Sequence, residues 1–304
     1  MTHVALTKLC GKAQLGNQKV SCYCVMITLR EITDSSALVV AHPDDEVLWF
    51  SSILEDVGKI LVCFLDVASR PDWSAGRRES LRTYPRNSVF SLGLTESEVF
   101  NGAAWPDPVP SEFGLYVARR TGSLQGYSFE TYKYNFERLK DKLRHKLTGI
   151  RNVFTHNPWG EYGHEEHVQV FLAVDALRAE LGFRLWFSNY FSNKSYGLML
   201  RYMTGFDGAH RTLKTRPKLG KRVQALYARN GCWTWFSDYQ WPVNETFMLW
   251  DGNSPKTSRA GAVFPLNFIR IEFSPSRDSE RSWRTLAGRI LRRLGPRLPR
   301  GHSH

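Results

Sequence analysis

The sequence has no long hydrophobic run. No segment reaches the roughly 18 apolar residues that a membrane-spanning helix needs, and residues 1–30 lack the uninterrupted apolar core of a signal peptide. Hydrophobic residues make up 42% and charged residues 23% of the 304 residues, as in ordinary globular proteins. We therefore expect a soluble, cytoplasmic protein, whose only contact with a membrane would be peripheral, at the inner surface.

Cysteine is scarce and forms no paired framework. The number of cysteines is odd, and they lie at Cys10, Cys22, Cys24, Cys63 and Cys232. The closely spaced Cys22 and Cys24 have no second pair with which to build a zinc site. Reduced thiols in a cytosolic protein explain this pattern, because such compartments rarely keep disulfides.

Acidic residues are absent from the C-terminal tail. Residues 281–304 contain seven arginines and no Asp or Glu. The formal net charge is +12, of which these arginines contribute +7 and the rest of the chain +5. A mildly basic body argues against a nucleic-acid partner. The tail places Trp283, Leu286, Ile290 and Leu294 on one face. This pattern is compatible with a solvated helix and with an amphipathic helix that contacts anionic membranes.

The chain divides into three parts. Residues 1–34 form an extension, in which the β-branched and aromatic residues of Val20–Leu29 are typical of an edge strand. Residues 35–275 carry the patterns of a single main domain, the catalytic one if the motifs below are functional. Residues 276–304 are the basic tail.

Apolar runs and helical patterns alternate within the main domain. Short runs typical of strands buried on both faces of a sheet occupy Ala37–Ala41, Ile60–Leu65, Asn152–Thr155 and Arg184–Phe187. Helices are expected over residues 46–57, 75–92 (interrupted at Pro85), 129–147, 167–181 and 219–229. This alternation predicts a Rossmann-like α/β fold, in which a mostly parallel sheet carries helices on both faces.

The first polar motif, Ala-His-Pro-Asp-Asp-Glu at Ala41–Glu46, directly follows the first predicted strand. Ligands of open α/β sheets bind at the carboxyl ends of strands. Three adjacent carboxylates repel one another, and a divalent cation relieves that repulsion. Histidine nitrogen and carboxylate oxygen are ordinary zinc ligands. Taken alone, however, the motif is equally compatible with a helix cap formed by Asp44 or Asp45.

The second motif, Thr155–His167, again lies between a predicted strand and a predicted helix. His164 and His167 are three residues apart and share a helix face, so one can be a ligand and the other a catalytic group. Alone they would more often be surface residues. Together with His42 and Asp45, His167 completes a set of three ligands that leaves one position for water, as a hydrolytic zinc requires.

The two motifs together resemble those of the LmbE-like (PIG-L) family of zinc-dependent de-N-acetylases, over roughly residues 36–190. The resemblance implies a Rossmann-like sheet and one catalytic Zn²⁺ held by His42, Asp45 and His167. It also implies that Asp44 is the general base acting on the zinc-bound water. His164 would support the oxyanion or protonate the leaving amine, and Tyr162 would also contact the oxyanion.

Two features depart from the family's pattern. Glu166 replaces the Asp that usually precedes the ligand histidine, so a carboxylate is retained. Many members carry an Arg and a Glu on the helix after the second strand, followed by a Leu-Gly pair. Here Arg77, Arg78 and Glu79 lie well before that pair, across Pro85.

Substrate contacts are expected from three residues. Arg78 is chosen on the family resemblance. His156 ends a predicted strand beside the site, although a local hydrogen bond would explain it equally. Trp159, like Trp73, has a ring that can stack on a sugar, with packing as the alternative role.

The sequence therefore predicts a zinc-dependent N-deacetylase. Its substrate would be an N-acetylated amino sugar that is nucleotide-linked, lipid-linked or part of a surface glycan, and the products would include acetate. One alternative is a zinc amidase or esterase acting on another acylated small molecule or natural product. Another is a metal-containing binding protein without turnover, and a nucleic-acid-binding module has only the tail in its favour.

Overall fold

The computed structural model describes residues 28–117, 129–203, 209–250, 252 and 265–270. Most of the N-terminal extension and all of the basic tail lie outside this part, so the edge strand and the tail helix stay predictions. Leu29, the last residue of the expected edge strand, instead begins a short helix, α1 (Leu29–Thr33). Among the described residues, no helix combines the length and the apolar character needed to span a bilayer.

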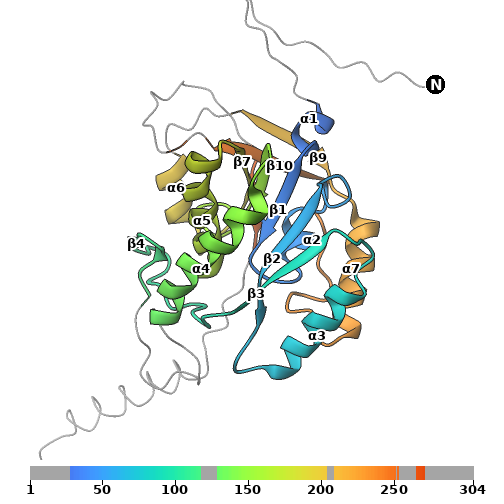
Figure 1. The fold of residues 1–304 in the computed structure, drawn as a ribbon, viewed down its shortest axis with the longest axis horizontal. Helices are drawn as coiled ribbons and strands as arrows, with labels where there is room; N and C mark the ends of the chain where they lie inside the picture. The colour runs from blue at the N-terminus through green and yellow to red at the C-terminus, as the bar shows by residue number, and fades with distance from the viewer. Residues whose placement is uncertain (1–27, 118–128, 204–208, 251, 253–264, 271–304) are drawn as a thin grey trace, which may run out of the picture.

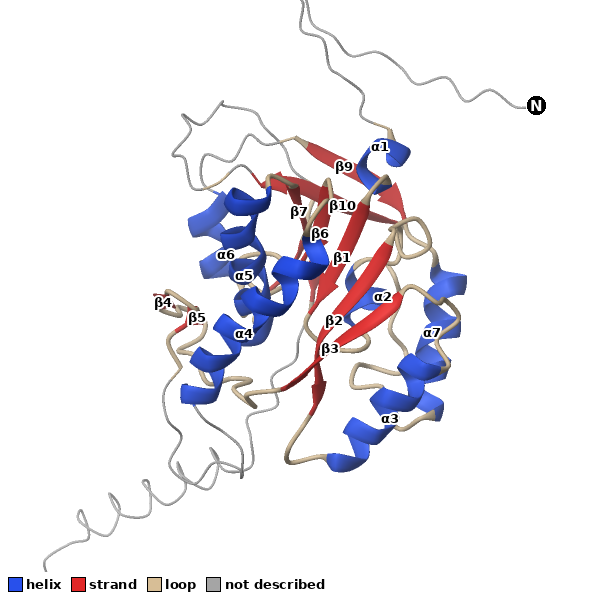
Figure 2. Cartoon of the chain, in the orientation of Figure 1, coloured by secondary structure: helices blue, strands red, loops and turns tan. Residues whose placement is uncertain are grey.

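A seven-stranded sheet forms the centre of the fold (Figures 1 and 2). Its spatial order is β3 (Val89–Thr95), β2 (Lys59–Asp66), β1 (Ser36–Val40), β6 (Asn152–Thr155), β7 (Arg184–Ser188), β10 (Asn244–Trp250) and β9 (His210–Lys214). The first five strands of this order run parallel, and β10 is antiparallel to both of its neighbours. The predicted class, a mostly parallel α/β sheet in a single domain, is confirmed.

Helices cover both faces of the sheet (Figure 1). One side carries α4 (Phe129–Leu147), α5 (Glu165–Leu181) and α6 (Tyr196–Met203), and the other α2 (Asp45–Trp49), α3 (Pro71–Arg82) and α7 (Pro217–Arg229). Two small pairs of strands lie outside this sheet: β4 (Pro110–Ser111) with β5 (Gly114–Leu115), and β8 (Tyr190–Ser192) with β11 (Asn267–Ile269).

The central strands are apolar on both faces because each face has its own core. Along β1, Ala37 and Val39 belong to the core that includes α4 and α5. Leu38 and Val40 belong to the core on the side of α2 and α7. All four side chains are fully buried, which is why this strand is an unbroken apolar run instead of an alternating one.

Two helices differ from the sequence prediction. α2 ends at Trp49 and does not continue to Val57, because the backbone N–H groups of Ser51 and Ser52 donate to the carboxylate of Glu245. α3 begins at Pro71, a favourable first position for proline, and ends at Arg82. Pro85 therefore lies after the helix, and the residues that follow form β3, a strand that the sequence analysis missed.

The order of the sheet reverses between β1 and β6. From β1 the chain proceeds outward to β2 and β3, and then crosses to the opposite side of β1 to form β6 and β7. In open α/β sheets, such a reversal opens a crevice at the carboxyl ends of the two strands. The first motif follows β1 and the second follows β6, so the topology brings both to this crevice.

Candidate metal centre

The turn after β1 holds the first motif in a strained conformation. Asp44 takes the N-cap position of α2 with φ 98°, in the left-handed region, where a non-glycine residue costs about 1–3 kcal/mol. Its side chain does not cap the helix, so that interpretation of the motif is wrong. Instead, Oδ2 of Asp44 accepts hydrogen bonds from Thr234. Asp45 folds back, and its Oδ2 accepts the backbone N–H of His42 at 2.7 Å.

The loop between β6 and α5 depends on glycine. Gly160 and Gly163 have φ of 68° and 87°, and Glu161 between them has φ 47°. A Cβ atom on Gly160 would lie 2.5 Å from the carbonyl oxygen of His164. Because Gly160 has no Cβ atom, the backbone at residue 160 can lie directly against that of His164. This places His164 at the N-cap of α5 and His167 in its first turn.

The structure brings His42, Asp45 and His167 together in the crevice. Their ligand atoms all lie within 4.8 Å of one another. Nδ1 of His42 is 3.3 Å from Oδ2 of Asp45, and Nε2 of His167 is 3.3 Å from Oδ1 of the same carboxylate. All three side chains are buried. We call these three residues the triad.

A carboxylate lies behind each histidine of the triad. Nδ1 of His167 donates to Oε2 of Glu161 at 2.8 Å, and Nε2 of His42 donates to Oε2 of Glu166 at 2.9 Å. The remaining nitrogen of each ring faces Asp45. Metal-binding histidines usually have such a carboxylate partner, because it fixes the tautomer and the orientation of the ring.

Nε2 of His167 tests whether a metal ion fits this site. The atom is buried and forms no hydrogen bond with any of the described residues, although buried polar atoms nearly always have partners. A divalent cation held by His42, Asp45 and His167 would provide that partner. Two histidines and one aspartate are also an ordinary zinc ligand set. The residues present therefore fit a metal ion.

His156 does not face a substrate. It is fully buried, and its Nε2 accepts the backbone N–H of Ala41 at 2.8 Å. Its Nδ1 donates to Oε2 of Glu161 at 3.0 Å. Both ring nitrogens are thus used inside the protein. The expected substrate contact is wrong, and the local hydrogen bond is what the structure shows.

Glu161 is a site residue that the sequence analysis missed. Burial raises the pKa of this carboxyl, but the neighbouring His156 and His167 outweigh burial and lower the pKa to about 2. Its Oε1 accepts the backbone N–H of Asn157 at 3.0 Å and the hydroxyl of Ser188. Glu161 is therefore an ionised anchor beneath the triad, and its place between two glycines was the only local hint.

A pocket of about 270 Å³ opens beside the triad. Its lining residues are His42, Asp44, Asp45, Leu48, Trp73, Arg77, Glu96, Phe100, Tyr162, His164, Thr234 and Trp235. The set includes the three residues expected to be catalytic, and it adds several aromatic rings.

Burial and the adjacent Asp45 raise the pKa of Asp44 to about 8, so this carboxyl is far more basic than an ordinary aspartate.

His164 presents a hydrogen-bond donor to the same pocket. Burial and the nearby His167 hold its pKa well below the usual range, so the ring is neutral. Its Nδ1 accepts the backbone N–H of Glu166 at 3.2 Å. The proton of the neutral ring must therefore lie on Nε2.

Arg77, and not Arg78, reaches the pocket. Arg77 is buried and its Nη1 donates to Oε1 of Glu96 at 2.5 Å. Arg78 points to solvent, where its side chain is 55% exposed and pairs with Asp66. Successive residues of a helix are rotated by about 100° around its axis, so neighbours on α3 cannot face the same way. Arg78 does not line this pocket, so its contact with a substrate stays a prediction.

Trp159 is also not a substrate contact. It is fully buried, and its Nε1 donates to the carbonyl oxygen of Tyr190 at 2.7 Å, so packing is its role. The tryptophans that line the pocket are Trp73, on α3, and Trp235, in the segment between α7 and β10.

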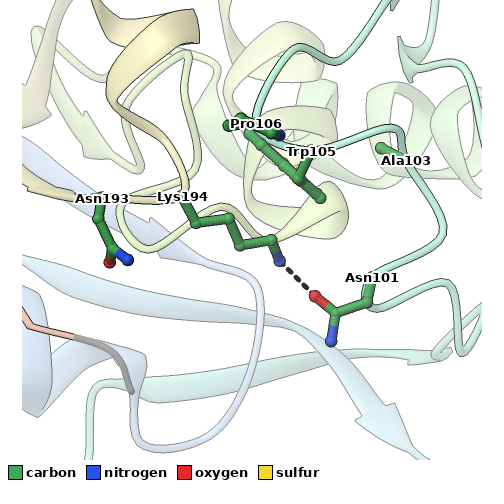
Figure 3. A pocket seen from close by; sticks show the side chains of 6 residues that line it. All are labelled: Asn101, Ala103, Trp105, Pro106, Asn193 and Lys194. Atoms are coloured by element: carbon green, nitrogen blue, oxygen red, sulfur yellow. Dashed lines mark hydrogen bonds between the residues drawn. The ribbon is translucent and has the colours of Figure 1, made fainter. Parts of the chain in front are cut away.

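A second pocket, of about 410 Å³, lies near the first. It is lined by Asn101, Ala103, Trp105, Pro106, Asn193 and Lys194 (Figure 3). Nζ of Lys194 donates to Oδ1 of Asn101 at 2.6 Å and lies 4.6 Å from the ring centroid of Phe100. Phe100 stacks on His164, at 4.8 Å between centroids, and lines the first pocket. Its ring therefore contacts residues of both pockets.

Comparison with known proteins gives only distant likenesses. No family model and no curated protein sequence matches the chain. Solved structures that match the chain include a deacetylase of teicoplanin biosynthesis in complex with teicoplanin (14% identity, TM-score 0.41), the zinc-inhibited form of teicoplanin deacetylase (14%, 0.43) and the deacetylase of A40926 pseudoaglycone (12%, 0.41). They align with 70% of this chain and 96–97% of their own. At such values, the function must be argued from this chain's own residues.

Proposed function

We propose that this chain is a zinc-dependent hydrolase that removes the acetyl group from an N-acetylated amino sugar. The observation that supports it most is the convergence of His42, Asp45 and His167, with Nε2 of His167 left for a metal ion. The resemblance of the two motifs to LmbE-like enzymes supplies the choice of zinc and of substrate class. When bound, zinc would act as a Lewis acid and lower the pKa of a water to about 7.

Asp44 is suited to accept the proton of the attacking water. It lines the pocket next to the proposed ligand Asp45 without belonging to the triad. Thr234 donates both of its hydrogen bonds to Oδ2 of Asp44, so Oδ1 remains to accept a proton. The same carboxyl can then return the proton to the amine that leaves.

His164 and Tyr162 are suited to stabilise the negative charge that develops on the acetyl oxygen. Both line the pocket, and the Nε2 proton of the neutral His164 is a donor. The phenol of Tyr162 is a second donor in the same wall. Donors that are already oriented in a pocket poor in water contribute the largest share of catalysis in many acyl transfers.

The remaining lining suits a sugar. Trp73, Trp235 and Phe100 offer apolar ring faces, and Arg77 offers donors to hydroxyl groups. The second pocket beyond Phe100 gives room for the group to which the sugar is linked. Its polar residues (Asn101, Asn193 and Lys194) lie beside Ala103, Trp105 and Pro106, so the pocket offers both polar and apolar contacts to that group.

Metal analysis followed by measurement of acetate release tests this proposal. We expect one zinc ion per chain, loss of activity on chelation and recovery on return of zinc. Acetate would be measured with free, nucleotide-linked and β-linked N-acetylglucosamine. Protein that retains full activity after the metal is stripped would refute the metal-dependent mechanism. Turnover of other acylated small molecules without any N-acetylated sugar would favour the amidase or esterase alternative.

A further inference from the structure

We propose that Thr234 is a positioning residue, which holds the carboxylate of Asp44 in the orientation that a general base requires. The inference rests on the proposed function, because it concerns the step in which Asp44 takes a proton. Thr234 lies in the last third of the chain, outside both motifs and outside the segment that resembles LmbE-like enzymes.

Thr234 gives two hydrogen bonds to the same oxygen of Asp44. Its backbone N–H donates to Oδ2 at 3.2 Å, and its hydroxyl donates to Oδ2 at 2.7 Å. Two donors from one residue restrict both the position of this oxygen and the plane of the carboxylate. Because both bonds use Oδ2, Oδ1 is the oxygen that remains to accept a proton.

The surroundings of Asp44 combine like and opposite charges. The side chain is only 2% exposed and lies beside the carboxylates of Asp45 and Glu46. Its backbone is in the left-handed region, where its N–H donates to Oε2 of Glu46 at 3.0 Å. The cation of Arg77 acts on the same carboxylate in the opposite direction. Neighbouring charges alone therefore do not fix its orientation, whereas the two directed hydrogen bonds from Thr234 do.

The segment 230–241 is anchored before Thr234. Nδ2 of Asn230 donates to the hydroxyl of Ser80 on α3 at 2.9 Å. The carbonyl oxygen of Asn230 lies so close to Gly76 that a Cβ atom there would be 2.1 Å away. The start of the segment is therefore packed directly against the backbone of α3.

The same segment is anchored after Thr234. The ring of Trp235 lies edge-on to Trp49 of α2, at 5.3 Å between centroids. Further along, Nε1 of Trp241 donates to the carbonyl oxygen of Val47 at 2.7 Å. Thr234 itself is exposed, but contacts on both sides hold it over the turn that carries Asp44. A site residue held by such a rigid frame keeps its geometry.

Two substitutions of Thr234 separate its hydroxyl from its shape. Thr234→Val keeps the shape and the backbone N–H but removes the hydroxyl, whereas Thr234→Ser keeps the hydroxyl. We expect Thr234→Val to lower kcat by about tenfold to a hundredfold, the value of one hydrogen bond to a charged group, with KM and bound metal unchanged. Thr234→Ser should stay within about threefold of the wild type.

Combination with Asp44→Asn shows whether Thr234 acts through Asp44. In that background, Thr234→Val should cause no further loss of kcat, because residues that act as a unit are not additive. A wild-type kcat for Thr234→Val would overturn the inference. A loss of the same size with and without the Asp44 carboxylate would overturn it as well.

Crystal structures of the two variants give a measurement that needs no substrate. Asp44 should keep its side-chain conformation in Thr234→Ser and leave it in Thr234→Val. If the wild type releases acetate from no sugar, the proposed function fails, but these structures still decide the role of Thr234. An unchanged Asp44 in Thr234→Val would overturn the inference.

Discussion

The carboxylate of Glu161 accepts a hydrogen bond from Nδ1 of His167 at 2.8 Å, on the opposite side of the ring from Asp45. The same oxygen accepts the Nδ1 proton of His156 at 3.0 Å. Glu161 thus sets which nitrogen of His167 carries the proton. It leaves Nε2 directed at Asp45, in the state that a metal ion requires.

Replacing Glu161 should weaken metal binding without removing a ligand. The ionised carboxylate of Glu161 accepts hydrogen bonds from two histidine N–H groups and one backbone N–H. Glu161→Gln replaces this carboxylate with a neutral amide. We expect metal affinity to fall by about 10- to 100-fold, measured by competition with a chelator of known affinity. Glu137→Gln, at an exposed ion pair with Lys140, is the control. Equal metal affinities in the two variants would show that Glu161 does not contribute to metal binding.

Two neighbouring residues of the first motif should separate metal binding from catalysis. Asp44 lies outside the triad, so Asp44→Asn should keep the metal and lose most turnover, by about 10²- to 10⁴-fold. His42→Ala removes a ligand and should lose the metal as well. Elemental analysis and kcat, measured on the same samples, check both statements. Full activity in Asp44→Asn would show that the base is another group.

Replacement of the two adjacent arginines on α3 should have very different effects on stability and on activity. Arg77→Ala leaves the carboxylate of Glu96 without its buried partner, which should cost about 3–5 kcal/mol of unfolding free energy. It should also lower kcat/KM, because Arg77 lines the pocket. Arg78→Ala breaks an exposed pair and should change stability by about 0–1 kcal/mol, with kcat/KM unchanged. Urea unfolding and steady-state kinetics make the comparison, and similar losses in both variants would contradict the assignment.

Two glycines with similar backbone angles should respond differently to alanine. Gly149 and Gly160 have φ of 76° and 68°, so a Cβ atom costs about 1–2 kcal/mol of backbone strain at either position. Nothing lies within 4 Å of a Cβ at position 149, but the carbonyl oxygen of His164 would be 2.5 Å from one at position 160. Gly160→Ala should therefore cost about 1–3 kcal/mol more in denaturant unfolding and lower activity. Equal losses of unfolding free energy in the two variants would mean that the loop at Gly160 moves to accommodate the Cβ atom.

Local patterns in the chain were sufficient to predict most of the central fold. The β1 run is apolar because both faces of the strand are covered, and this was visible without any knowledge of its neighbours. The buried side chains of α4 recur at spacings of three and four, as a helix with one covered face requires. The predicted strand over Asn152–Thr155 has the bounds of β6. Burial leaves a periodic mark on the sequence, so it can be predicted from the sequence.

The amino-acid sequence by itself determined which two segments carry the polar clusters and that each follows a buried strand. Only the tertiary structure decided how the site is completed. Thr234 bonds Asp44 across 190 residues of chain, and Glu245 ends α2 from 194 residues beyond Ser51. The sequence did not show which of Arg77 and Arg78 is buried, because that depends on how α3 is rotated against the sheet. Such contacts join single residues that are distant in the chain, and a single pair leaves no periodic pattern to be recognised.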